Sequence, residues 1–181
     1  MKTNGLIFKL SVSTVFAIFV LGIAFHFLVV SDGSPDWRLT GNHAPRGLLT
    51  QFVKDNAINL DEFDTGKMTI REVKLPQQVQ PLYFIDPRIS TEDIQKEPLC
   101  GTAGCLFTGY VKTGWRDFQS VFEFYLNPWI PPEFDLFWPE IELRNGMPLL
   151  HIIQKSPHKG MGLVRATLVF DGNQYVVAKM D

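Results

Sequence analysis

Two cysteines offer the clearest chemistry in this sequence. Cys100 and Cys105 are the only cysteines, and the segment between them contains Gly101 and Gly104. These glycines allow a tight turn that brings the two sulfur atoms together, and in an oxidising compartment such a pair is most simply a structural disulfide. A redox-active pair usually has the spacing Cys-x-x-Cys, and a zinc site would need two histidines as further ligands. We therefore predict a disulfide that shapes one loop, and no metal site.

Catalytic motifs are absent from the sequence. It contains no Gly-x-Ser-x-Gly, His-Glu-x-x-His, P-loop or Gly-x-Gly-x-x-Gly pattern, so no catalytic residue and no cofactor are predicted. His151 lies in an apolar run at 149–153, a position more typical of a half-buried histidine on a sheet than of a general base. Two alternatives stay open. One is a hydrolase that uses acidic residues and His151 in a cleft, and the other is a small-ligand binder with an enclosed apolar cavity.

An aromatic and proline-rich stretch occupies residues 127–140. It combines four prolines with Trp129, Phe134, Phe137 and Trp138. Proline is excluded from central strands, so we expect an extended loop. The four aromatic side chains either cap one end of the core or form an exposed surface for a partner protein or the membrane interface, where tryptophan is favoured. We take these four residues as candidate contact residues.

The N-terminal segment has the length and composition of a membrane anchor. Leu10–Val30 contains no charged residue, and a helix of this length would span about 31 Å, the thickness of a hydrocarbon core. Lys2 and Lys9 precede the segment, and the first charged residues after it are acidic. The positive-inside rule then places the N-terminus in the cytoplasm. A cleaved signal peptide is the alternative, but its apolar region is usually shorter, about 7–15 residues.

This predicts three parts of the chain. Residues 1–30 form a cytoplasmic tip and a transmembrane signal-anchor, 31–45 a linker rich in Gly, Ser, Pro, Asp and Asn, and 46–181 an extracytoplasmic domain. The protein would be a single-pass membrane protein with its domain in the periplasm or the thylakoid lumen.

The elements that would position these residues are mostly strands. Asp171-Gly172 between two apolar runs signals a hairpin. Apolar residues in 45–58 have the spacing of one short amphipathic helix. We predict an α+β fold, mainly antiparallel β, as an open sheet or a sandwich with one short packed helix. Runs suited to a pleated surface occur at 67–75, 82–85, 106–111, 118–126, 149–153 and 163–169.

Charge and composition exclude one class of function. The chain has 181 residues, 45% of them hydrophobic and 13% aromatic, which suits one domain plus an anchor. Lys2 and Lys9 are the only charges in the first thirty residues, so the rest has 15 basic against 19 acidic residues, a net charge of −4. No cluster of Lys and Arg is present, which argues against nucleic-acid binding.

Three motifs in residues 82–179 resemble a family of uncharacterised bacterial envelope proteins, including cyanobacterial ones. They are Leu99-Cys-Gly-Thr-Ala-Gly-Cys105, Asn145-Gly-Met-Pro-Leu-Leu-His-Ile152 and Phe170-Asp-Gly-Asn-Gln-Tyr175. In that family the second motif often reads Asn-Gly-x-x-Asp-Leu, whereas this chain has Leu149 in place of the acidic residue. The resemblance implies a small β-domain outside the cytoplasm, and it brings no catalytic residue with it.

Together these patterns favour a non-catalytic accessory or protein-binding domain, anchored to the bacterial envelope or the thylakoid membrane by Leu10–Val30. Its expected partner is a membrane or envelope protein. That partner would dock on the sheet or on the aromatic stretch.

Overall fold

The computed structural model describes residues 37–59, 63–89, 97, 99–128, 130, 135–156 and 162–181. These residues belong to one compact unit, Trp37–Asp181. The predicted anchor Leu10–Val30 lies outside the described residues. Within the described part, no helix has the length and apolar character needed to cross a membrane.

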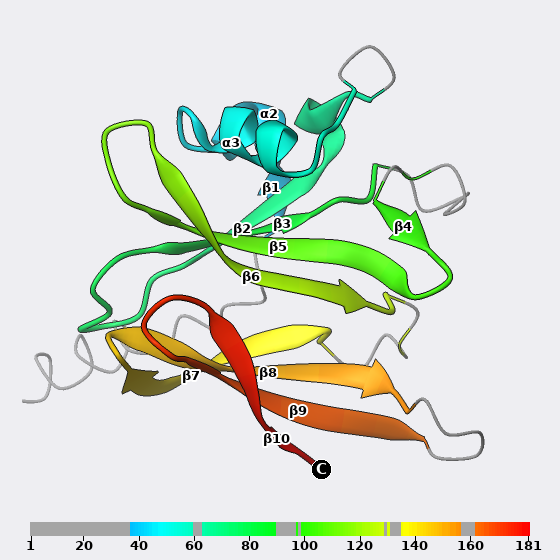
Figure 1. Cartoon of the computed structure of the whole chain (residues 1–181), viewed down its shortest axis with the longest axis vertical. Coiled ribbons are helices and arrows are strands. Elements are labelled where there is room, and N and C mark those ends of the chain that lie inside the picture. Colours follow the sequence, from blue (N-terminus) through cyan, green and yellow to red (C-terminus); the bar gives the residue numbers. More distant parts are fainter. Residues whose placement is uncertain are drawn as a thin grey trace, which may run out of the picture. The chain divides into compact units, whose positions relative to one another are not determined.

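Antiparallel strands in two sheets make up most of this unit (Figure 1). The six-stranded sheet has the order β1-β2-β3-β5-β4, with β6 paired to β5. Its strands are β1 (Arg38–Leu39), β2 (Thr69–Val73), β3 (Leu82–Asp86), β4 (Cys100–Gly101), β5 (Gly104–Lys112) and β6 (Phe118–Leu126). The four-stranded sheet has the order β10-β9-β8-β7. Its strands are β7 (Phe137–Arg144), β8 (Met147–Lys155), β9 (Leu163–Phe170) and β10 (Tyr175–Met180).

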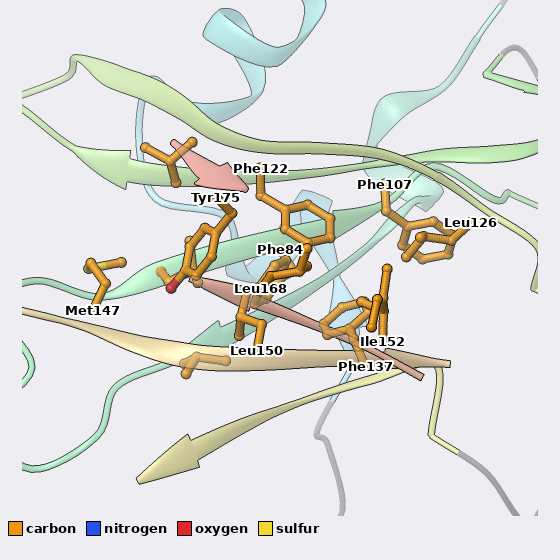
Figure 2. Close-up of a cluster of buried hydrophobic side chains, with 14 of the residues drawn as sticks. Phe84, Phe107, Phe122, Leu126, Phe137, Met147, Leu150, Ile152, Leu168 and Tyr175 are labelled. Carbon is orange, nitrogen blue, oxygen red and sulfur yellow. The ribbon is translucent and has the colours of Figure 1, made fainter. Parts of the chain in front are cut away.

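Side chains from both sheets share one hydrophobic core (Figure 2). Phe84 of β3 packs on Phe137 of β7 with ring centroids 4.4 Å apart, and Phe122 of β6 lies 6.2 Å from Tyr175 of β10. The sheets therefore face each other as a sandwich, which is one of the two predicted arrangements. Each fully buried phenylalanine of this kind contributes about 1.5–3 kcal/mol by leaving water.

The opposite face of the six-stranded sheet is covered by a short helix, α3 (Leu48–Asp55). Leu48 and Phe52 are one turn apart and fully buried, and they pack in one cluster with Met68, Ile85 and Tyr110. The amphipathic helix predicted within 45–58 is thus present, and its spacing is what places both apolar side chains on the sheet.

The folded unit begins earlier than the composition indicates. The predicted linker 31–45 contains β1, which pairs with β2, and the one-turn helix α2 (Thr40–His43). Trp37 packs edge-on against Phe137 at 5.5 Å, and the buried Thr40 hydroxyl donates to the Thr65 carbonyl in the 3-10 helix η1 (Thr65–Lys67). Gly and Asn signal turns locally, but pairing with β2 gives this segment a place in the sheet.

The strands predicted at 82–85, 118–126 and 163–169 correspond closely to β3, β6 and β9. The hairpin at Asp171-Gly172 joins β9 to β10. Its geometry explains the sequence signal, because the Asp171 carboxylate accepts from the backbone N–H groups of Asn173 and Gln174. Gly172 has a φ of 112°, which favours glycine.

The last four residues of the proline-rich stretch, 137–140, depart from the prediction of an extended loop. Residues 137–144 form β7, and this strand contains Pro139. Because β7 is an edge strand of its sheet, and its pairing with β8 is irregular between Pro139 and Leu143, the missing N–H of proline is tolerated there.

Candidate functional site on the four-stranded sheet

Three neighbouring strands place a tryptophan, a histidine and a threonine side by side. Trp138 of β7 pairs with His151 of β8, and His151 pairs with Thr167 of β9. The residues on either side of His151 and Thr167, and Phe137 before Trp138, belong to the core. Since successive side chains of a strand point to opposite faces, these three side chains lie on the outer face of the sheet. We call this group, with Glu140 and Arg165, the Trp138 patch.

His151 is held at both ring nitrogens. Its Nε2 lies 2.7 Å from Glu140 Oε1, and its Nδ1 lies 3.1 Å from Thr167 Oγ1. A carboxylate only accepts hydrogen bonds, so Nε2 carries the proton. In the neutral ring the Thr167 hydroxyl then donates to Nδ1. The His151 side chain is 11% exposed and that of Glu140 is 44% exposed, so the pair sits at the edge of solvent.

The tryptophan of the patch contacts both a histidine ring and an arginine guanidinium. The rings of Trp138 and His151 are 5.2 Å apart and inclined by only 30°. The exposed Arg165 of β9 places its guanidinium carbon 5.3 Å from the Trp138 ring centroid, a cation–π contact. Trp138 is therefore fixed in place while part of it still meets solvent.

Chemically, this arrangement has the hydroxyl–imidazole–carboxylate order of a hydrolytic triad. Such a triad also needs oxyanion donors and a substrate cavity beside the hydroxyl. The helix α3 packs on the other sheet, so its N-terminal amides are not at Thr167. A cavity of about 230 Å³ is lined by Ser120, Glu123, Gln174, Tyr175 and nearby β6 residues, not by His151. The geometry of the patch provides a rigid contact surface.

The same cavity bears on the small-ligand alternative. Its volume of about 230 Å³ is below the range of about 300–1,000 Å³ typical of small-molecule sites. Among the described residues, no group of three or more His, Cys, Asp and Glu side chains is placed to hold a metal ion.

The four predicted contact residues have different positions. Phe137 is 2% exposed and packs on Phe84 and Phe107 in the core, so the core-packing alternative applies to it. Its neighbour Trp138 is on the opposite face, because the stretch is a strand here and not a loop. Trp129 and Phe134 lie outside the described residues.

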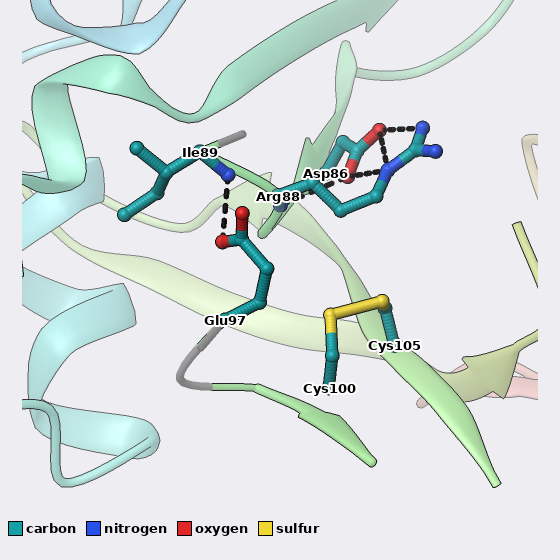
Figure 3. Close-up of polar contacts among 6 residues, drawn as sticks. All are labelled: Asp86, Arg88, Ile89, Glu97, Cys100 and Cys105. Atoms are coloured by element: carbon teal, nitrogen blue, oxygen red, sulfur yellow. Dashed lines mark hydrogen bonds and ion pairs between the residues drawn. A yellow bond between two sulfur atoms is a disulfide. The ribbon is translucent and has the colours of Figure 1, made fainter. Parts of the chain in front are cut away.

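The two cysteines are brought together at the end of the six-stranded sheet (Figure 3). Cys100 of β4 pairs with Cys105 of β5, and their sulfur atoms are 2.10 Å apart, which is bonding distance. Gly104 has a φ of 113°, and a Cβ there would lie 2.4 Å from the Leu126 carbonyl oxygen. Gly104 is thus required by the turn, whereas a Cβ at Gly101 would meet open space.

Close to the disulfide is a buried polar cluster that sequence reasoning missed. Asp86 is 5% exposed and binds the Arg88 side chain through both carboxylate oxygens, and Glu97 accepts from the Ile89 N–H at 2.8 Å (Figure 3). Burial lowers the pKa of Arg88, but its hydrogen bond with Asp86 and the nearby acidic charges outweigh burial and raise it. The signal was Asp86-Pro87-Arg88, in which the Asp86 carboxylate also accepts from the Arg88 backbone N–H. These contacts hold the backbone in place directly after β3, so we assign the cluster a structural role.

Comparison with known proteins adds no assignment. The chain matches no protein-family model, no curated protein and no solved structure. The resemblance to envelope proteins therefore depends on the three sequence motifs alone.

Proposed function

We propose that this chain is a membrane-anchored, non-catalytic accessory domain of the bacterial envelope or thylakoid that binds a partner protein. The segment Leu10–Val30 would hold it in the membrane with its N-terminus in the cytoplasm. The Trp138 patch would be the docking surface. The cysteine pair supports the extracytoplasmic location, because structural disulfides persist in oxidising compartments.

The observation that carries the docking proposal is the contact of Trp138 with both His151 and Arg165. Tryptophan and arginine are the residue types most enriched at the energetic centres of protein interfaces. The affinity of an interface is also higher when its side chains are already ordered before binding. Here His151, fixed by Glu140 and Thr167, supports one face of the indole, and Arg165 lies over the ring.

The experiment is a pull-down of the native full chain in mild detergent, followed by binding measurements with the purified partner. We expect Trp138→Ala to weaken binding by about 30-fold or more, as for an interface hot spot. Ile141→Ala is the matched control, because Ile141 is 84% exposed on the same strand and has no stacking partner among the described contacts. Equal affinity of the wild type and Trp138→Ala would contradict the proposal.

One observation favours a second candidate, a hydrolase in which Thr167, His151 and Glu140 act as nucleophile, base and orienting carboxylate. Their order and their spacings of 3.1 Å and 2.7 Å fit these roles. A fluorophosphonate probe should then label Thr167 in the wild type, and neither Thr167→Val nor His151→Ala should be labelled. Absence of labelling in the wild type would leave docking as the function.

A further inference from the structure

The most exposed tryptophan of the described residues lies at the tip of the hairpin between β5 and β6. Trp115 is 81% exposed. The backbone N–H groups of Thr113 and Gly114 both donate to the Asp117 carbonyl, at 2.9 and 3.3 Å. A Cβ at Gly114 would come within 2.6 Å of the Asp117 carboxylate. The turn is therefore compact, and it projects the indole into solvent.

A second contact supports this tip from the side. Gly47, directly before α3, has a φ of 91°, and a Cβ there would lie 2.3 Å from the Arg116 carbonyl oxygen. The loop before α3 thus lies against the hairpin tip, as Figure 1 also shows at the top of the six-stranded sheet. Glycine is needed at position 47 for this close approach.

Positive charges surround the exposed indole. The Lys112 ammonium lies 5.8 Å from the Trp115 ring centroid, and Arg116 follows Trp115 directly. Lys112 and Arg116 are exposed, as is Arg46 next to Gly47. Asp117 is the one acidic residue within 112–117. An indole flanked by cations matches the chemistry of a bilayer interface, where tryptophan sits at the headgroup level and Lys and Arg bind lipid phosphates.

In the chain, the proposed anchor is followed closely by the folded unit. If Leu10–Val30 is an anchor, residues 31–36 join it to Trp37, where the folded unit begins. Even fully extended, this connection spans about 20 Å. The chain then runs through β1 and α2 to Gly47, which contacts the tip. An inserted anchor would therefore keep the folded unit, and the tip with it, within reach of the bilayer.

We propose that Trp115 enters the headgroup region of the anionic bilayer that holds the anchor, with Lys112 and Arg116 on lipid phosphates. This inference depends on the anchor of the proposed function but not on its docking patch. It gives the domain a second attachment that would fix its orientation on the membrane and leave the Trp138 patch for a partner.

The test uses the full chain in lipid nanodiscs with 5-fluorotryptophan at its four tryptophans. Trp115→Phe identifies the Trp115 fluorine signal, and Trp138→Phe identifies that of Trp138 in the patch. In discs that contain phosphatidylglycerol and a lipid spin-labelled near the headgroup, we expect loss of the Trp115 signal and retention of the Trp138 signal. Lys112→Gln with Arg116→Gln should restore the Trp115 signal, whereas Lys54→Gln, an exposed lysine of α3, should not.

Each result decides the inference. Retention of the Trp115 signal in a chain that is inserted in the discs overturns it and leaves the anchor intact. Equal loss in discs of phosphatidylcholine alone overturns the role of the cations. A chain that does not enter the discs overturns the anchor and this inference together.

Discussion

The two tryptophans Trp138 and Trp115 are exposed in different ways. Trp138 lies along a sheet face, stacked on His151 and covered in part by Arg165. Trp115 stands at a hairpin tip, 81% exposed, with one described ring contact, to Lys112. A side chain held by neighbours contributes to the stability of the fold and is ready for a precise protein contact. A side chain with few packing neighbours contributes little to the stability of the fold. It can adapt to a fluid surface such as lipid.

The largest expected effect tests the assignment of faces that underlies this comparison. Phe137→Ala should lower the free energy of unfolding by about 3–5 kcal/mol, because it opens a cavity beneath the patch. Trp138→Ala, one residue further along the same strand, should lower it by only about 1 kcal/mol, because the stacked ring is partly solvated. Denaturant unfolding measures both values. Equal losses of unfolding free energy in the two variants would contradict the assignment of these residues to opposite faces of the sheet.

Tyr175 joins β10 to the rest of the four-stranded sheet beneath the patch. Its hydroxyl donates to the Pro148 carbonyl at 2.9 Å, and burial raises its pKa above the ordinary value of 10.0. The folded state thus holds the proton more tightly than the unfolded state does. This stabilisation is complete below pH about 10 and is lost as the pH rises further.

Tyr175→Phe should therefore cost about 1–3 kcal/mol at neutral pH, because the Pro148 carbonyl loses its donor. It should also make the alkaline decline in stability shallower. The remaining slope would come from Tyr110 and Tyr83, whose pKa values are raised by burial and then by Asp55 and Glu72 respectively. Unfolding titrations from pH 7 to 11 measure both effects, and an unchanged alkaline slope would argue against a buried Tyr175.

The support of Trp138 by His151 gives the third expectation. His151→Ala removes both ring hydrogen bonds and the stacking surface, so it should cost about 1–3 kcal/mol of stability. It should also weaken partner binding indirectly, because Trp138 loses its support although His151 itself does not contact the partner. Glu140→Gln, which keeps an acceptor for the His151 Nε2–H, should cost less than about 1 kcal/mol. Binding that survives His151→Ala unchanged would show that Trp138 needs no support.

The smallest expected effect concerns the tip. Trp115→Ala should change the free energy of unfolding by less than about 0.5 kcal/mol, as is usual for surface substitutions. Ile141→Ala, at a site 84% exposed, is its control and should behave alike. Thermal unfolding measures both variants. A larger loss at Trp115 would mean that the indole is part of the fold and that the contrast with Trp138 is false.

Much of the fold follows from local patterns. The aromatic and β-branched residues in 118–126 predict β6, and the spacing of Leu48 and Phe52 predicts α3 on a sheet. Asp171-Gly172 predicts the last hairpin because the aspartate carboxylate binds the next backbone amides and glycine adopts the positive φ. Burial on one face and local hydrogen bonding are properties of short segments, so sequence alone reports them.

Other features depended on partners distant in the chain. Pro139 argues against a strand, and only its edge position beside β8 makes β7 possible. β1 has two residues and no pattern of its own, and it exists because β2 offers unpaired backbone groups.

The sequence by itself determined the antiparallel β class, the short helix, the final hairpin and the close approach of Cys100 and Cys105, because each follows from contacts between near neighbours. Only the tertiary structure decided which aromatic side chains meet solvent. Trp138 and Phe137 are adjacent in sequence, yet the pleat turns one outward and the other into the core. The Trp138 patch joins three strands through the register of β7, β8 and β9, and such a register is set by the packing of whole sheets.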